Sequence, residues 1–170
     1  KLLNMMMMMM MTAMMRPREA KHVGCIEKER HALLELKASM VLYDTSLLPT
    51  WDSKSHGCCC AWLGIICSNQ TGHVEMLDLN GYQFGHFLGT INTSLMELQH
   101  LKYLNLSWNS FSNNIFPEFF GSLSNLRYLD LQSSFNGGKI PNDLARLSHL
   151  QYLDLSWNQL EGTIPHQLGN

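Results

Sequence analysis

Five cysteines are the residues of this 170-residue chain best suited to covalent or metal chemistry. Four lie in the stretch GCCCAWLGIIC (57–67), and the fifth is Cys25. Zinc sites use pairs such as C-x2-C together with a second pair, and this stretch offers neither. A catalytic thiol needs a partnering histidine, and the sequence identifies none. We therefore expect disulfides and no metal. Because adjacent cysteines cannot easily bond each other, the partners should lie at a distance.

Signatures of other chemistry are missing from the sequence. It contains no paired carboxylates, nucleophile elbow, phosphate loop or kinase motif, so we expect no enzyme activity and no cofactor. The sequence contains 12 Lys and Arg residues and 14 Asp and Glu residues, which gives a net charge of −2. Such a balance provides no basic surface for nucleic acid or for an anionic membrane.

An internal repeat predicts the architecture. The segment LKYLNLSWN (101–109) recurs as LRYLDLQSS (126–134) and LQYLDLSWN (150–158), with a weaker copy VEMLDLNGY (74–82). The copies start at residues 74, 101, 126 and 150, in steps of 27, 25 and 24 residues. The leucines of LxxLxL share one face of a short strand, and a single unit cannot bury them. Stacked units bury them in a continuous core beside a parallel strand ladder, which predicts an α/β repeat solenoid.

Two further features belong to each repeat. We expect the buried amides of Asn109 and Asn158 to bond the backbone of the turn after the strand, with Ser134 and Tyr82 at the equivalent positions. A second apolar pair should complete the core of each unit: Leu95 with Leu98, Phe120 with Leu123, and Leu144 with Leu147.

The outward strand positions form columns across the stacked units. One holds Met76 and three tyrosines, the next holds three aspartates and Asn105, and two tryptophans follow the strands. Exposed aromatics on a rigid concave face suit a protein or peptide interface, although Tyr and Asp there also favour strand formation and cross-strand hydrogen bonds. The predicted ligand-binding residues are Tyr103, Tyr128, Asp130, Tyr152, Asp154, Trp108 and Trp157.

The residues before the repeats predict an end cap. The first unit of a solenoid has an uncovered apolar end, which a terminal unit must shield. Residues 27–42 show the spacing of an amphipathic helix, and the cysteine stretch follows, so we assign residues 21–73 to this cap. Residues 1–20, with their methionine run, are interpreted as a degenerate signal-like or disordered N-terminus.

These motifs carry a family resemblance. The repeats, with Gly-x-Ile-Pro at 138–141 and 162–165, resemble the plant-type extracellular leucine-rich repeat. The preceding region resembles its N-terminal cap: Cys25, ERHALL (29–34), Trp51, CCAWLGIIC (59–67) and TGHV (71–74). The resemblance implies disulfides Cys25–Cys59 and Cys60–Cys67. Cys58 is an extra cysteine that could replace Cys59.

The resemblance also implies a function. The chain is similar to plant leucine-rich-repeat receptor-like proteins, a cell-surface group that includes fungal-xylanase receptors and other immune receptors. It implies a non-catalytic ectodomain in defence or signal perception, which reaches the extracellular or plasma-membrane surface by the secretory pathway. The implied partners are a protein or peptide ligand and a co-receptor. No segment is predicted to span a membrane.

Two alternatives remain open at this stage. One is a secreted protein resembling polygalacturonase inhibitors, and the other is a truncated leucine-rich-repeat receptor kinase without its kinase domain. Four repeats without a closing cap lead us to expect part of a longer receptor. Three N-x-[ST] sequons, at Asn69, Asn92 and Asn105, are consistent with glycosylation. Asn105 ranks last because a glycan there would block the concave face.

Overall fold

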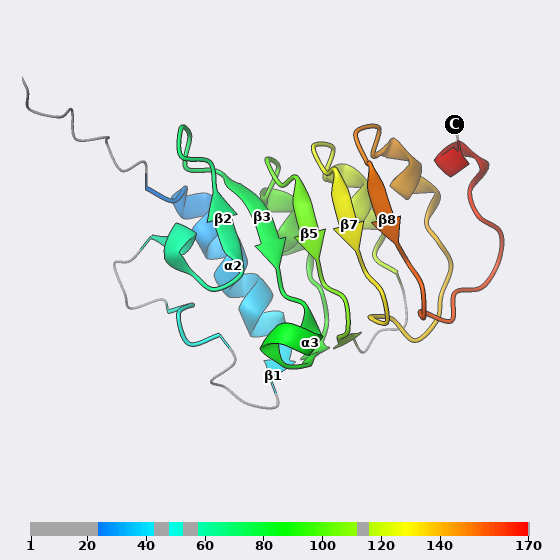
Figure 1. Ribbon diagram of the computed structural model, residues 1–170, viewed down its shortest axis with the longest axis horizontal. Coiled ribbons are helices and arrows are strands. Elements are labelled where there is room, and N and C mark those ends of the chain that lie inside the picture. Colours follow the sequence, from blue (N-terminus) through cyan, green and yellow to red (C-terminus); the bar gives the residue numbers. More distant parts are fainter. Residues whose placement is uncertain (1–23, 43–47, 53–57, 112–115, 170) are drawn as a thin grey trace, which may run out of the picture.

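The computed structural model describes residues 24–42, 48–52, 58–111 and 116–169, and the predicted N-terminal segment 1–20 lies outside them (Figure 1). The repeats stack side by side, each contributing one strand to the same sheet, as the predicted α/β repeat solenoid requires. The elements in chain order are α2 (Glu27–Ser39), β1 (Met40–Leu42), η1 (Cys59–Ala61), β2 (Ile65–Cys67), β3 (Val74–Asp78), α3 (Gly81–Phe84), β4 (Phe87–Gly89), η2 (Thr93–Glu97), β5 (Tyr103–Asn105), β6 (Ser110–Phe111), η3 (Glu118–Ser122), β7 (Tyr128–Asp130), η4 (Asn142–Arg146), β8 (Tyr152–Asp154) and η5 (His166–Gly169).

The main sheet has the strand order β2-β3-β5-β7-β8. Strands β3, β5, β7 and β8 run parallel, and their register places equivalent residues of successive repeats opposite each other. The predicted parallel ladder is therefore confirmed. Strand β2 pairs antiparallel with β3 and comes from the cysteine-rich segment, so the cap extends the sheet of the repeats.

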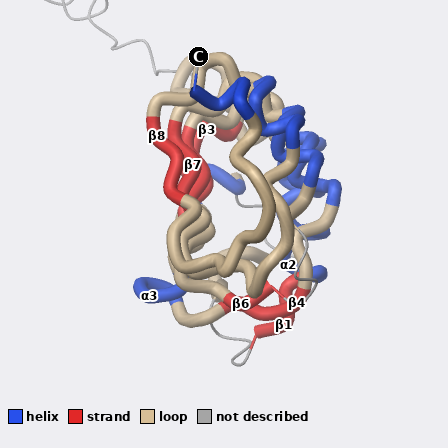
Figure 2. Tube along the Cα trace, turned by 90° about the vertical axis from the view of Figure 1, so that its right-hand side faces the viewer, coloured by secondary structure: helices blue, strands red, loops and turns tan. Residues whose placement is uncertain are grey.

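The core lies between the strands and the 3₁₀ helices, which occupy opposite sides of the solenoid (Figure 2). Leucines of the strands and apolar residues of η2, η3 and η4 fill it. Burying one such side chain stabilises the fold by about 1.5–3 kcal/mol. Most of the predicted core residues are buried, with exposed fractions of 5% or less: Leu77, Leu104, Leu129, Leu79, Leu106, Leu131, Leu95, Leu98, Phe120, Leu123, Leu144 and Leu147. Leu153 and Leu155, the corresponding leucines of the last repeat, are only partly buried.

The turn after each strand is held by a buried polar side chain. Asn109 donates to the carbonyl oxygens of Leu79 and Leu106 at 2.9 and 2.7 Å, and accepts from the N–H of Phe87 at 3.0 Å. Asn158 bonds the backbone in the same way. These bonds confirm the role expected of the asparagines.

The other two repeats satisfy the turn differently. The hydroxyl of Ser134 donates to the Leu106 carbonyl at 2.6 Å. Tyr82 does not occupy a buried turn position, because residues 81–84 form the short helix α3, and its side chain is 86% exposed. The Asn80 side chain caps this helix by accepting from the N–H of Gln83.

Residues 40–42 belong to a second, smaller sheet, so the prediction of a continuous helix over 27–42 is wrong at its C-terminal end. Helix α2 ends at Ser39, and residues 40–42 form β1, which pairs antiparallel with β4. Strand β4 in turn pairs parallel with β6. Ser39 marks the transition, because its hydroxyl donates to the carbonyl oxygens of both Leu36 and Thr90.

The cap shields the first repeat as expected. Leu33 and Leu36 of α2 and the stacked rings of Trp51 and Trp62 are all buried. Glu29, only 3% exposed, joins α2 to the first repeat: its carboxylate contacts His73 Nδ1 and accepts from the N–H of Val74, both at 2.7 Å. One charged side chain therefore fixes the helix to the start of β3.

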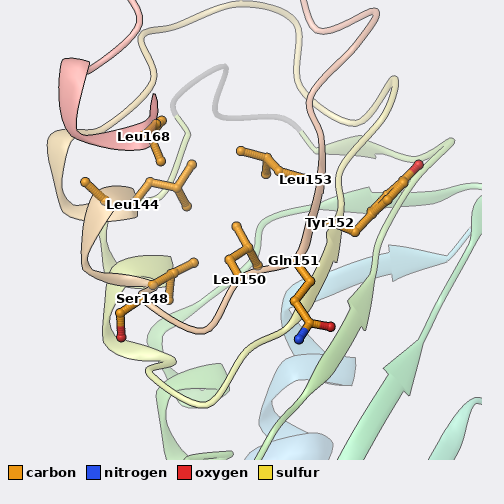
Figure 3. A pocket seen from close by; sticks show the side chains of 9 residues that line it. Leu144, Ser148, Leu150, Gln151, Tyr152, Leu153 and Leu168 are labelled. Atoms are coloured by element: carbon orange, nitrogen blue, oxygen red, sulfur yellow. The ribbon is translucent and has the colours of Figure 1, made fainter. Parts of the chain in front are cut away.

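Strand β8 is the edge strand at the other end of the main sheet, and a groove lies beside it (Figure 3). Leu144, Leu150, Leu153 and Leu168 line it together with polar residues such as Gln151. The equivalent leucines of earlier repeats are buried because the following repeat covers them. In the part of the chain that the structure describes, no helix is long and apolar enough to cross a membrane.

Candidate ligand-binding face

The outward side chains of β3, β5, β7 and β8 form one surface, which we call the strand face. On it, Tyr103, Tyr128 and Tyr152 stack ring over ring. Both neighbouring pairs have ring centroids 4.3 Å apart, with the ring planes within 8° and 3° of parallel. The strand spacing of roughly 4.8 Å in a sheet sets this stacking distance. The three tyrosines therefore form a single rigid aromatic column.

A second column runs beside the tyrosines and contains Asp78, Asn105, Asp130 and Asp154 in register. In each of them Oδ1 accepts the N–H of the residue two positions later, at 2.9 to 3.2 Å. These side chains therefore close the strand ends. The second oxygens of the outer two aspartates lie near the tyrosine hydroxyls, at 3.5 Å for Asp130 and 3.4 Å for Asp154.

Burial changes the acidity of this column. It raises the pKa of Asp78, with a further increase from the charge of Asp130. Burial likewise raises the pKa of Asp130, and the charge of Asp154 adds to the effect. Hydrogen bonds from the hydroxyl and N–H of Ser156 lower the pKa of Asp154. Asp78 and Asp130 thus carry their charge at a cost in free energy that Asp154 does not bear.

The hydroxyls of Tyr103 and Tyr128 stay protonated at neutral pH. Burial is the main cause that raises the pKa of both Tyr103 and Tyr128, and neighbouring negative charges add to it. The column therefore presents neutral rings edged by hydroxyl groups.

Tryptophans lie at the turns that follow β5 and β8. Trp108 and Trp157 have φ angles of 60° and 62°, in the left-handed region, and their side chains are 41% and 78% exposed. This conformation typically costs about 1–2 kcal/mol for a residue with a side chain. Tyr82, from the turn after β3, is an exposed aromatic residue that the sequence analysis did not include among the predicted binding residues.

The structure brings together most of the predicted binding residues on the strand face, but it corrects the expectation for Asn105. That side chain is only 7% exposed, because its Oδ1 bonds the N–H and hydroxyl of Ser107, which is also buried. Asn105 therefore keeps its place in the column of aspartates, but its side chain is not exposed as expected. Of the other sequons, Asn69 is exposed, and Asn92 is partly buried, with its amide bonded to the Glu35 carbonyl.

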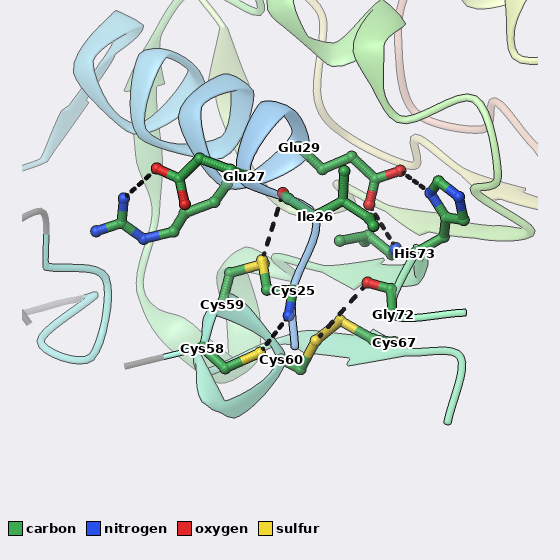
Figure 4. Close-up of a disulfide and its surroundings, with 12 residues drawn as sticks. Cys25, Ile26, Glu27, Glu29, Cys58, Cys59, Cys60, Cys67, Gly72 and His73 are labelled. Carbon is green, nitrogen blue, oxygen red and sulfur yellow. Dashed lines mark hydrogen bonds and ion pairs between the residues drawn. A yellow bond between two sulfur atoms is a disulfide. The ribbon is translucent and has the colours of Figure 1, made fainter. Parts of the chain in front are cut away.

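The cysteines lie together beside the start of α2 (Figure 4). The structure has disulfides Cys25–Cys59 and Cys60–Cys67, the pairing that the resemblance implies, and Cys58 is free. Two groups of three cysteine sulfurs are compact enough for a metal ion. A metal binds thiolates, however, and four of the five sulfurs are joined in disulfides.

Comparison with known families agrees with this architecture. A leucine-rich repeat model matches residues 99–160, and a leucine-rich repeat N-terminal domain model matches residues 26–68. Together with the solenoid and its disulfide-bonded cap, these matches show that the chain belongs to the leucine-rich repeat family.

Within this family the chain is similar to plant receptor-like proteins. It shares 44% identity over 132 residues with Receptor-like protein EIX2 of Solanum lycopersicum, a match that covers 73% of this chain and 13% of the relative. The chain thus spans about an eighth of the length of that protein.

Solved structures show the same fold. The BIR2 ectodomain from Arabidopsis thaliana superposes with a TM-score of 0.74 at 33% identity, over 82% of this chain and 72% of BIR2. The ectodomain of the Arabidopsis receptor kinase HAESA, solved with an IDA peptide hormone ligand, gives a TM-score of 0.72 at 30% identity. That match covers 84% of this chain and 23% of HAESA.

Proposed function

We propose that this chain forms part of the non-catalytic, ligand-binding ectodomain of a plant receptor-like protein and that its strand face binds a protein or peptide. The single observation that carries the proposal is the stacked column of Tyr103, Tyr128 and Tyr152 on a rigid parallel sheet. Large amphipathic rings that are already ordered contribute contact area at little entropic cost.

The acidic column defines the chemistry that such a ligand must offer. Asp130 and Asp154 are acceptors whose Oδ1 atoms are committed to the backbone. Their Oδ2 atoms accept only long bonds from the hydroxyls of the neighbouring tyrosines, at 3.5 and 3.4 Å, so each can accept a further bond from a ligand donor. No ion pair involves either carboxylate among the described residues. We therefore expect the ligand to place N–H donors or a cationic side chain beside an apolar group that covers the tyrosine rings.

The relatives support the proposed role and location. HAESA binds a peptide hormone, and the BIR2 and HAESA structures are both ectodomains. The disulfides in the cap fit an oxidising compartment, so we place the chain in the secretory pathway and at the cell surface. A co-receptor remains part of the proposal, as do perception of a signal and a role in defence.

A selection experiment tests the binding face. Peptides of 15 residues are selected from a random display library against the immobilised chain, and the dissociation constants of the enriched peptides are measured by calorimetry. Tyr128→Ala and Tyr152→Ala should each weaken binding by more than ~1 kcal/mol, or about fivefold. Tyr128→Phe keeps the ring and should retain most of the affinity.

The matched control is Glu118→Ala, an exposed position in η3 on the helix side of the solenoid. It should leave the affinity unchanged. Enriched peptides that tolerate both tyrosine substitutions but lose affinity with Glu118→Ala would place binding on the opposite face and refute the proposal.

A further inference from the structure

The free thiol of Cys58 lies among the sulfurs of the cap disulfides. The sulfur atoms of Cys25, Cys58 and Cys60 all lie within 4.8 Å of one another, so Cys58 is near one sulfur of each disulfide. The backbone N–H of Cys25 donates to the Cys58 sulfur at 2.8 Å. This bond holds the free sulfur against the residue whose disulfide anchors the N-terminus of α2 (Figure 4).

We propose that the cap contains a site of internal thiol–disulfide exchange, in which Cys58 and Cys59 alternate as the partner of Cys25. The thiolate of Cys58 attacks the sulfur of Cys25. The Cys58–Cys25 bond forms as the Cys25–Cys59 bond breaks, and Cys59 leaves with the electron pair as a thiolate. The proton that Cys58 releases to water is regained by Cys59, so one thiol and one disulfide are present throughout and no outside oxidant takes part.

Two features favour Cys25 over Cys60 as the target and make the exchanged state tolerable. Cys58 and Cys59 lie 33 and 34 residues from Cys25, so either disulfide closes a loop of nearly the same length and entropy. Attack on Cys60 would instead join residues two positions apart. Cys59 is fully buried, and a buried cysteine thiol packs as a small apolar side chain.

The exchange gives the cap an alternative disulfide that can replace Cys25–Cys59. Cys58 is partly exposed and therefore accessible to thiol reagents, whereas Cys59 is not. A reductant that opens Cys25–Cys59 would leave Cys58 beside Cys25, ready to close the loop again under oxidising conditions. In both states a disulfide ties the segment just before α2 to the start of η1. This inference concerns the cap and does not depend on what the strand face binds.

Counting the free thiols in three variants of the full chain tests the pairing. Each variant is expressed through an oxidising secretory route. The proteins are quenched in acid, unfolded, labelled with N-ethylmaleimide at about pH 4.5 and weighed intact, because acid suppresses the attacking thiolate. Cys59→Ser should show no free thiol, since Cys58 takes over Cys25; two free thiols would overturn the inference. The matched controls are Cys58→Ser, with no free thiol, and the Cys58→Ser/Cys59→Ser double variant, with one.

A second measurement uses the unsubstituted chain and does not depend on how a variant folds. After incubation at pH 8, acid quench and labelling, fragmentation mass spectrometry locates the maleimide within residues 57–67. Exchange predicts label on both Cys58 and Cys59. Label on Cys58 alone, however long the incubation, would show that the disulfides of the native chain do not exchange.

Discussion

Replacing Asn109 with alanine should strongly destabilise the solenoid. The side chain is 6% exposed and bonds four backbone groups: the carbonyl oxygens of Leu79, Leu106 and Ser107 and the N–H of Phe87. Alanine leaves all four without this partner. A hydrogen bond contributes a net ~1 kcal/mol, and an unsatisfied buried group costs about 1–3 kcal/mol, so we expect a loss of about 3–5 kcal/mol in the free energy of unfolding. That is a large share of a typical total stability of about 5–15 kcal/mol.

The repeat itself provides a graded comparison. Ser134 occupies the equivalent turn and keeps one backbone bond through its hydroxyl, so Asn109→Ser should lose less stability than Asn109→Ala. Equilibrium unfolding in guanidinium, followed by circular dichroism, gives both values. Asn136→Ala, at an exposed position, is the control and should stay within ~0.5 kcal/mol of the unsubstituted chain. A loss below ~1 kcal/mol for Asn109→Ala would refute the role assigned to the amide.

Two further pairs of substitutions test the strand face and the cap. Asp130→Asn should raise the free energy of unfolding at pH 7, because burial raises the pKa of Asp130 and its charge disfavours the fold; Asp154→Asn should lower it, because hydrogen bonds lower the pKa of Asp154. The contribution of Asp130 to the free energy of unfolding falls as pH rises from 3.8 through its folded pKa, and that of Asp154 is lost as pH falls below 3.8. The stability differences between each variant and the unsubstituted chain should therefore shrink in acid. Thermal unfolding from pH 3 to 7 measures these differences, and an Asp130→Asn variant that is less stable at pH 7 would contradict the reasoning. Gly64→Ala should cost more than ~2 kcal/mol, because φ is +78° and the added Cβ would lie 2.1 Å from the Asp78 carbonyl oxygen, whereas Gly24→Ala enters open space and should be neutral. Equal melting temperatures for the two glycine variants would show that the cap does not constrain Gly64.

Periodicity was sufficient to predict the core but not the surface. The LxxLxL pattern identifies Leu104 and Leu129 as inward-facing because the alternation of a strand is local. The burial of Asn105 depends on the hydroxyl of Ser107 and on neighbouring columns, and alternation alone cannot show that.

The same distinction explains the elements that were missed. Strand β1 exists because residues 40–42 meet β4, far along the chain, and its three residues carry no strand signal of their own. The pairing of Cys25 with Cys59 followed from family resemblance, since spacing alone left several partners open. The contact between Cys58 and Cys25 had no signal in the sequence beyond the extra cysteine.

Site-specific photo-crosslinking tests most directly whether the strand face is the binding surface. Benzoylphenylalanine is placed at Tyr128 on the strand face in one protein and at Glu118 on the helix side in another, and each is irradiated with the tightest peptide from the selection. We predict that position 128 crosslinks to the peptide and that excess unlabelled peptide suppresses the product, while position 118 gives none. Crosslinking at position 118 without any at position 128 would contradict the proposal that the tyrosine column binds the ligand.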